Sequence, residues 1–211
     1  MAYSPAIHEA QGVVNIVLAG TVNAGDLLGY SSGWKRADAD ARIPARLVAM
    51  QTGASGDTIP ACVSGVLVDL DAPYTAGDPQ YLSATAGEHT ATIPAVSSTL
   101  TLLQRIGVAV TTEKVVFDLT PRGPHYLRAT AAVNPASAAT DAIADLAVTV
   151  TGVLATDYVQ ALPPADIEAG VVVSAVTPTA DTVTLRLHNP TAGTVDGASK
   201  TWTFLVTRLT S

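Results

Sequence analysis

Residues that supply reactive chemistry are scarce in this sequence. The 211 residues include one cysteine, two tryptophans and two phenylalanines, and aromatic residues make up only 5%. A single cysteine excludes an intrachain disulfide framework, and Cys62 lies in an apolar stretch, which indicates a buried, unreactive thiol. So few aromatic side chains also argue against a large, aromatic-lined ligand cavity.

Charge is scarce as well. Charged residues account for 14% of the chain, whereas an average soluble domain contains about 25%. The eleven Lys and Arg residues are scattered and the net charge is −7. We therefore expect no nucleic-acid partner, because phosphate binding needs clustered cations. A surface with so little charge indicates that other subunits cover part of it.

Long apolar runs are absent too. No window approaches about 18 uninterrupted apolar residues, so we expect neither a membrane-spanning segment nor a membrane partner. The first residues, Met1 to Pro5, have neither the basic region nor the apolar region of a secretory signal peptide. The sequence therefore predicts a chain that begins its life in a cytoplasm.

The chain is rich in the alternating pattern of half-buried strands. Between residues 181 and 188, Val183, Leu185 and Leu187 alternate with Thr, Arg and His, and a similar alternation recurs at residues 201–207. Gly and Pro separate such stretches at short intervals, as the turns of sandwiches and barrels require. The sequence therefore predicts an all-β protein built from antiparallel strands.

Two stretches are open to a helical interpretation. Residues 37–49 contain Ala and Arg but are interrupted by Pro44. Residues 134–146 begin with Asn-Pro, which suits a helix start, and continue with an Ala-rich body. A linker of small residues explains the second stretch equally well, so a domain boundary is expected near residues 122–142.

We therefore expect two domains flanked by smaller segments. The first is a small β-barrel or β-tulip-like domain, and the second is an antiparallel β-sandwich. The expected divisions are an N-terminal arm at residues 1–10, the barrel domain at 11–122, a linker at 123–142 and the sandwich domain at 143–211.

The first domain contains a short internal repeat. Residues 22–26 (VNAGD) recur as residues 74–78 (YTAGD), and residues 45–49 (ARLVA) resemble residues 104–108 (QRIGV). The offset between the two matches differs, so the second copy contains an insertion. Gly in Ala-Gly-Asp adopts a positive φ and Asp bonds nearby backbone, so each copy predicts a turn that leads into a strand.

One motif has a catalytic interpretation. Residues 29–33 (GYSSG) fit the G-x-S-x-G pattern, in which Ser31 would be the nucleophile of an esterase-like hydrolase. That pattern requires a strand, a strained turn and a following helix within an α/β sheet. No helix is expected after Gly33, so we interpret the motif as a polar hairpin turn.

Metal and acid–base sites have little support. The four histidines are far apart and none has the spacing of a zinc motif. Asp69 and Asp71, like Asp38 and Asp40, lie on one face of an extended segment, where they more often mark a solvated strand end than a paired acid–base site. We expect no catalytic residues, no metal and no cofactor.

The aromatic residues suggest two kinds of contact. Trp34 follows a turn and precedes Lys35 and Arg36, so it is a candidate anchor for a subunit interface, with ordinary packing over a hairpin as the alternative. Glycan sites also use exposed aromatic platforms, and the expected turns carry several aromatic residues: Tyr30, Trp34, Tyr74 and Tyr81. A receptor- or glycan-binding module therefore remains an alternative.

Several segments resemble head-decoration proteins of tailed phages. They are residues 76–87 (AGDPQYLSATAG), 103–109 (LQRIGVA) and 115–119 (VVFDL). Residues 181–204, which contain RLHNPTAG and Trp202, resemble the β domain appended to phage virion proteins. Together these segments span most of the chain.

The resemblance implies a structural virion protein without catalytic residues. It would resemble the lambda decoration protein, trimerise on the outer surface of an icosahedral capsid and stabilise the expanded head by binding the major capsid protein. An N-terminal arm of roughly Ala2 to Glu9 would reach the capsid surface. The candidate capsid or subunit contacts are Ala2, Tyr3, Ser4, Pro5, Ile7, Tyr30, Trp34 and Arg36.

Overall fold

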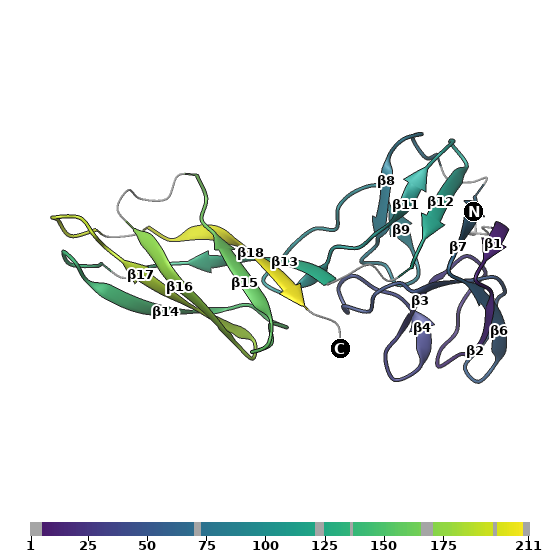
Figure 1. Cartoon of the computed structure of the whole chain (residues 1–211), viewed down its shortest axis with the longest axis horizontal. Helices are drawn as coiled ribbons and strands as arrows, with labels where there is room; N and C mark the ends of the chain where they lie inside the picture. Colours follow the sequence, from purple (N-terminus) through teal and green to yellow (C-terminus); the bar gives the residue numbers. More distant parts are fainter. Residues whose placement is uncertain are drawn as a thin grey trace. The chain divides into compact units, whose positions relative to one another are not determined.

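The structure, a computed structural model, describes residues 6–69, 73–120, 125–135, 137–165, 171–195 and 198–208. Within these ranges no helix occurs, and the strands pair antiparallel in several sheets (Figure 1). The predicted all-β class is confirmed. Accordingly, the described part of the chain has no helix long and apolar enough to cross a membrane.

The chain divides into two compact units. Unit 1 consists of Met1–Pro94 and Leu102–Gly123, and unit 2 consists of Ala95–Thr101 and Pro124–Ser211. The chain therefore enters unit 2 briefly, returns to unit 1, and then completes unit 2.

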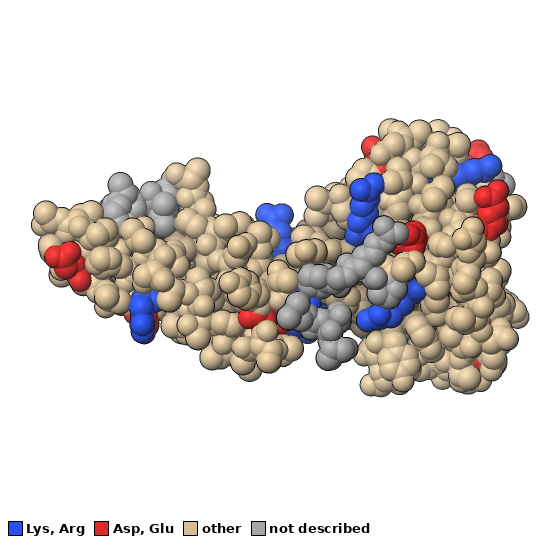
Figure 2. Space-filling model, in the orientation of Figure 1, with Lys and Arg blue, Asp and Glu red and all other residues tan. Residues whose placement is uncertain are grey.

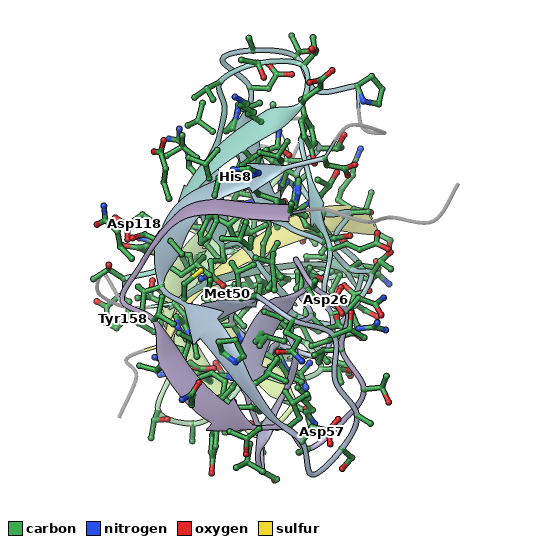
Figure 3. All side chains as sticks on the ribbon, turned by 90° about the vertical axis from the view of Figure 1, so that its right-hand side faces the viewer. His8, Asp26, Met50, Asp57, Asp118 and Tyr158 are labelled. Carbon is green, nitrogen blue, oxygen red and sulfur yellow. The ribbon has the colours of Figure 1, made fainter. Side chains whose placement is uncertain are left out.

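Unit 1 contains two sheets. Their strands, in chain order, are β1 (Ala6–Gln11), β2 (Val14–Val17), β3 (Leu27–Tyr30), β4 (Trp34–Arg36), β5 (Leu47–Ala49), β6 (Thr58–Cys62), β7 (Ser64–Val68), β8 (Pro79–Leu82), β9 (His89–Thr90), β11 (Arg105–Ala109) and β12 (Lys114–Asp118). One sheet has the order β2-β6-β5-β3-β4 and the other has the order β1-β7-β12-β11-β8-β9. In Figure 3, His8 marks β1 and Asp57 marks the turn before β6.

The internal repeat is confirmed by the sheet topology. The order β2-β6-β5-β3-β4 is repeated strand for strand by β7-β12-β11-β8-β9, and β1 is the one additional strand. Both copies of the Ala-Gly-Asp turn have glycine at a positive φ, 86° for Gly25 and 94° for Gly77. In one copy Gly25 N donates to Ala49 O, and in the other Gly77 N donates to Ala109 O. The two halves of unit 1 are therefore structural duplicates.

The sheets of unit 1 are open, whereas the sequence led us to expect a closed barrel. No sheet formed by the described residues closes on itself. The end strands β4 and β9 have three and two residues, so they offer few groups for pairing with the opposite edge. Contact between β4 and the end of β2 is limited to an isolated bridge between Trp34 and Leu18.

Unit 2 also contains two sheets. Its strands are β13 (His125–Val133), β14 (Ile143–Thr149), β15 (Tyr158–Leu162), β16 (Val172–Thr179), β17 (Thr182–His188) and β18 (Lys200–Arg208), and the short β10 (Thr101–Leu102) lies at the boundary between the units. The sheet orders are β10-β13-β18-β15 and β14-β17-β16. The predicted alternation is confirmed, because Val183, Leu185 and Leu187 of β17 are buried, as are Trp202 and Phe204 of β18.

Several segments differ from the sequence-based expectation. Of the expected linker 123–142, residues 125–133 form β13, which pairs along its whole length with β18 and buries Leu127 and Ala129. The Ala-rich stretch 134–146 forms no helix in its described part and instead enters β14. Residues 143–146 are mostly exposed, so pairing with β17 outweighs the helix preference of alanine there.

The remaining differences concern the first half of the chain. Residues 37–49 contain turns, a bridge between Asp38 and Ile43, and β5 instead of a helix. The described part of the expected arm forms β1, which is paired with β7.

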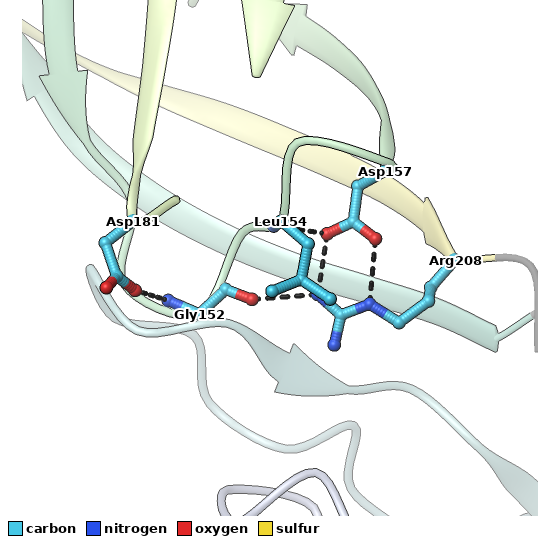
Figure 4. A network of polar contacts seen from close by, with 5 residues as sticks. All are labelled: Gly152, Leu154, Asp157, Asp181 and Arg208. Atoms are coloured by element: carbon cyan, nitrogen blue, oxygen red, sulfur yellow. Dashed lines mark hydrogen bonds and ion pairs between the residues drawn. The ribbon is translucent and has the colours of Figure 1, made fainter. Parts of the chain in front are cut away.

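A nearly buried ion pair stabilises unit 2 (Figure 4). Arg208 donates through Nε and Nη2 to the two carboxylate oxygens of Asp157, at 2.8 and 2.6 Å, and Nη2 also donates to Gly152 O at 2.8 Å. The Asp157 side chain is fully buried, and it also accepts from Leu154 N at 2.9 Å. Burial raises the pKa of the Asp157 carboxyl, but the hydrogen bonds from Arg208 and Leu154 outweigh burial and hold this pKa below its ordinary value.

Candidate functional site

The hairpin formed by β3 and β4 presents an aromatic pair. Tyr30 lies opposite Trp34 in the β3–β4 ladder, and their rings meet edge to face with centroids 5.6 Å apart. Tyr30 is 60% exposed, whereas Trp34 is half-buried and packs against the core cluster that includes Leu18 and Leu28. Trp34 therefore fixes the hairpin to the core, and Tyr30 remains accessible to a partner.

Arg36 has a structural contact in unit 1. Its Nε donates to Asp26 Oδ2 at 2.6 Å, and Asp26 is buried and also accepts from Asn23 N at 2.7 Å. The Arg36 side chain is 35% exposed. This pairing neutralises the buried carboxylate of Asp26 next to the repeated turn. Arg36 therefore has a structural role and little freedom to contact a partner.

Of the five candidate contact residues in the expected arm, the structure describes one. Ala2, Tyr3, Ser4 and Pro5 lie outside the described residues. Ile7 lies in β1 opposite Leu67 of β7 and is half-buried. The structure therefore places Ile7 in a sheet, and a capsid role for all five residues stays a prediction.

The G-x-S-x-G motif forms a hairpin turn, as predicted. Gly29 lies in β3, where a Cβ atom would come within 2.4 Å of Pro44 O, and Gly33 has a φ of 132°. Glycine is thus required at position 29 by backbone packing and at position 33 by the positive φ. Ser31 and Ser32 connect two paired strands, so the helix that a nucleophile elbow needs is replaced by β4.

The sequence did not predict a partly buried polar cluster in unit 1. Tyr74 Oη lies 3.2 Å from His89 Nε2, and His89 Nδ1 lies 3.1 Å from Gln80 Oε1. Gln80 is buried, and its Nε2 has no hydrogen-bond partner among the described residues. A neutral His89 satisfies both contacts if Nδ1 donates to Gln80 and Nε2 accepts from the tyrosine hydroxyl. The alternation of Gln80 with Leu82, both buried in β8, is the only sequence signal for this cluster.

Burial controls the ionisation of this cluster. It lowers the pKa of His89 to about 4, although the nearby Asp69 acts in the opposite direction. Burial, followed by the charge of Asp69, raises the pKa of Tyr74 above its ordinary value. Both side chains are therefore neutral at pH 7, and the cluster is a structural hydrogen-bond network with the charge of Asp69 close by.

Unit 1 is expected to lose stability in mild acid through His89. The unfolded chain binds a proton at His89 near pH 6.5, whereas the folded chain does so only near pH 4. The stability contributed by neutral His89 is complete above pH 6.5 and falls by about 3 kcal/mol as the pH drops from 6.5 to 4. Urea unfolding at several pH values, followed by the fluorescence of Trp34 in chains that also carry Trp202→Phe, measures this slope.

The matched variant is His89→Gln, whose side chain has no proton to gain in this range. Its stability should decrease less steeply between pH 6.5 and pH 4 than that of the natural chain. Equal slopes for the two proteins would contradict the assignment to His89.

Other candidate chemistry gains no support from the geometry. Within the described ranges, no three His, Cys, Asp or Glu side chains are grouped so that they could hold a metal ion. Cys62 is fully buried, and burial raises the pKa of its thiol to about 11, which keeps it protonated. On the face shown in Figure 2, neither positive nor negative residues form a continuous patch.

The four aromatic residues of a possible glycan platform fall into separate contacts. Tyr30 and Trp34 contact each other, while Tyr74 stacks at a tilt on His89 with centroids 5.5 Å apart. Tyr81 is half-buried in β8, opposite Arg105. Only the Tyr30–Trp34 pair therefore offers an exposed aromatic surface among these four.

Comparison with known proteins yields no relatives. No protein-family model, no curated protein and no solved structure matches the chain.

Proposed function

We propose that this chain is a non-enzymatic structural virion protein that binds the outside of an icosahedral phage capsid as a trimer. In this proposal the partner is the major capsid protein, unit 1 is the decoration domain, and attachment stabilises the expanded head. The observation that carries the proposal is the exposed Tyr30 on a hairpin that Trp34 holds against the core. Rigid aromatic side chains of this kind dominate the energetics of protein contacts.

Further features of the chain support a role in assembly. Charged residues are few, and large apolar side chains remain exposed in both units, among them Val17 and Tyr158. Exposed apolar surface of this kind is typical of proteins that function against other subunits. The segments 76–87, 103–109 and 115–119, which resemble decoration proteins, include β8, β11 and β12. These are paired strands of unit 1.

A second candidate is a receptor- or glycan-binding module of a phage tail or surface. The same Tyr30–Trp34 pair favours it, because sugars stack on exposed aromatic rings. The two candidates differ in what Tyr30 contacts, a capsid subunit or a sugar.

Attachment to heads tests the first candidate. Tyr30→Ala should lower the affinity for expanded heads that lack the decoration protein at least tenfold, which corresponds to about 1.4 kcal/mol, because a buried aromatic anchor is lost. Sedimentation of heads with bound protein measures occupancy as a function of protein concentration.

The matched control is Tyr126→Ala in unit 2, since Tyr126 is 59% exposed and Tyr30 is 60% exposed. This control should leave attachment unchanged. If the natural chain does not bind heads but binds glycans through Tyr30, the second candidate replaces the first.

A further inference from the structure

The duplicated sheets of unit 1 differ at one edge. In the six-stranded sheet, β1 covers the outer edge of β7. The equivalent strand of the five-stranded sheet is β2, and no described strand covers its outer edge. The duplication thus shows that an edge of this kind can accept an additional antiparallel strand.

The backbone groups at this edge can be assigned from the ladder. Pro60 O accepts from Met50 N, so the polar groups of Pro60 face β5. Asn15 lies opposite Pro60, and therefore its N–H and C=O face away from β6. Val17, two residues further on, presents its groups in the same direction. Beyond it the edge is closed, because Ala19 N donates to Trp34 O.

The covered edge of β7 has the same geometry. Leu18 N donates to Asp57 O, and Asp69 N donates to Glu113 O, so Leu18 and Asp69 occupy equivalent positions. By this alignment Asn15 and Val17 are equivalent to two residues of β7 that are paired with β1. These pairs are Val66 with His8 and Val68 with Ala6.

The β2 edge lacks the usual protection against strand pairing. No charged residue and no proline occurs between Gln11 and Gly25. By contrast, the opposite edge of the same sheet, β4, carries Lys35 and Arg36. Charged side chains and proline normally prevent edge strands from pairing with other chains. The exposed fractions of Val13 and Val17, 51% and 59%, leave apolar surface beside the outward-facing backbone groups.

We propose that β2 pairs antiparallel with β2 of a second copy of this chain, about a twofold axis at Asn15. The edge is complementary to itself: in this register Asn15 lies opposite Asn15 of the second copy, and Val13 lies opposite Val17. Two valine pairs flank an asparagine pair, and no like charges meet. The outward N–H and C=O groups then gain partners, as those of Val66 and Val68 do from β1. This twofold contact is distinct from a threefold capsid contact and goes beyond the proposed function.

The dependence of solution mass on concentration tests this contact. The natural chain should increase in mass toward twice its starting value as its concentration rises. Asn15→Lys places two like charges directly opposite each other and should shift this transition at least tenfold to higher concentration. Val116→Lys is the matched control, because Val116 is 45% exposed and lies in a strand with neighbours on both sides. It should behave as the natural chain does. A mass that does not change with concentration, or equal effects of the two lysine variants, would overturn the proposal.

A cross-link tests the register. Residues opposite each other in a hydrogen-bonded antiparallel pair have Cα atoms about 5.5 Å apart, which lies within the range of a disulfide. Asn15→Cys should therefore give a reducible dimer under mild oxidation, and the native Cys62 should not compete because it is fully buried. Val116→Cys should remain uncross-linked. If Asn15→Cys also fails to cross-link at concentrations where the mass has doubled, the register is wrong and the proposal fails.

Discussion

Replacing Gly107 with alanine should destabilise unit 1 by about 3 kcal/mol. Gly107 lies in β11, and a Cβ atom there would be 2.2 Å from Val116 O and 3.0 Å from Phe117 Cα. Both are backbone atoms of β12, so the clash cannot be relieved by a side-chain rotation. Relief requires separation of β11 from β12, two central strands of the six-stranded sheet. Urea unfolding followed by Trp34 fluorescence, in chains that also carry Trp202→Phe, measures the change.

Gly20→Ala is the matched control for this substitution. The nearest atom to a Cβ at Gly20 is Lys35 Cβ at 3.8 Å, which is ordinary contact. This variant should unfold within about 0.5 kcal/mol of the natural chain. If Gly107→Ala unfolds at the same urea concentration as Gly20→Ala, the close approach of β11 and β12 is not as described.

Removal of the Arg208 side chain should cost unit 2 about 3–5 kcal/mol, because it leaves the buried carboxylate of Asp157 without its cation. Arg208→Ala removes three hydrogen bonds, two to Asp157 and one to Gly152 O. Unfolding followed by the fluorescence of the buried Trp202, in chains that also carry Trp34→Phe, reports on unit 2.

The second ion pair of unit 2 provides a control. Arg186 and Asp145 also form a bidentate pair, with both distances 2.8 Å, but their side chains are 54% and 48% exposed. Water replaces much of that interaction, so Arg186→Ala should have a far smaller effect. The double variant Arg208→Ala with Asp157→Asn should be more stable than Arg208→Ala alone. A double variant as unstable as the single one would show that the buried charge is not the cause.

Local sequence patterns predicted the strands better than their arrangement. The alternation in β17 and β18 identified their buried faces, and the Ala-Gly-Asp turns identified the duplication, because both signals involve neighbouring residues. Closure of a sheet depends instead on edges far apart in sequence. The short β4 and the single bridge from Trp34 to Leu18 leave the sheet open.

The drift between the repeat copies has two sources that the sequence alone did not locate. The offset grows from 52 to 59 residues before Gln104, in the interval where Ala95–Thr101 enters unit 2. One further residue is added where the register of β11 against β8 shifts between Arg105 and Gly107: Ile106 has no partner in β8, and the neighbouring Gly107 has no side chain, which allows β12 to approach. In the sequence, nothing distinguished Gly107 from the other residues of the segment 103–109, which resembles decoration proteins.

The candidate site was predicted only in part. The exposed position of Tyr30 and the packing of Trp34 agree with a hairpin interpretation, because a G-x-S-x-G string without a following helix indicates a turn. The ion pair of Arg36 with Asp26 was not foreseen, although the aspartate belongs to the repeated turn. The cluster of Tyr74, Gln80 and His89 was not foreseen either, because it depends on which faces of β8 and β9 are covered.

The order of strands in unit 2 has a consequence during synthesis. β18 is made after every other described strand, yet it lies between β13 and β15 in its sheet. While the ribosome adds the residues that separate β13 from β18, for several seconds at about 5–20 residues per second, the apolar side chains of Leu127 and Ala129 lack their partner strand. The nascent chain, more than the finished protein, is therefore the form of unit 2 that exposes these apolar side chains to water.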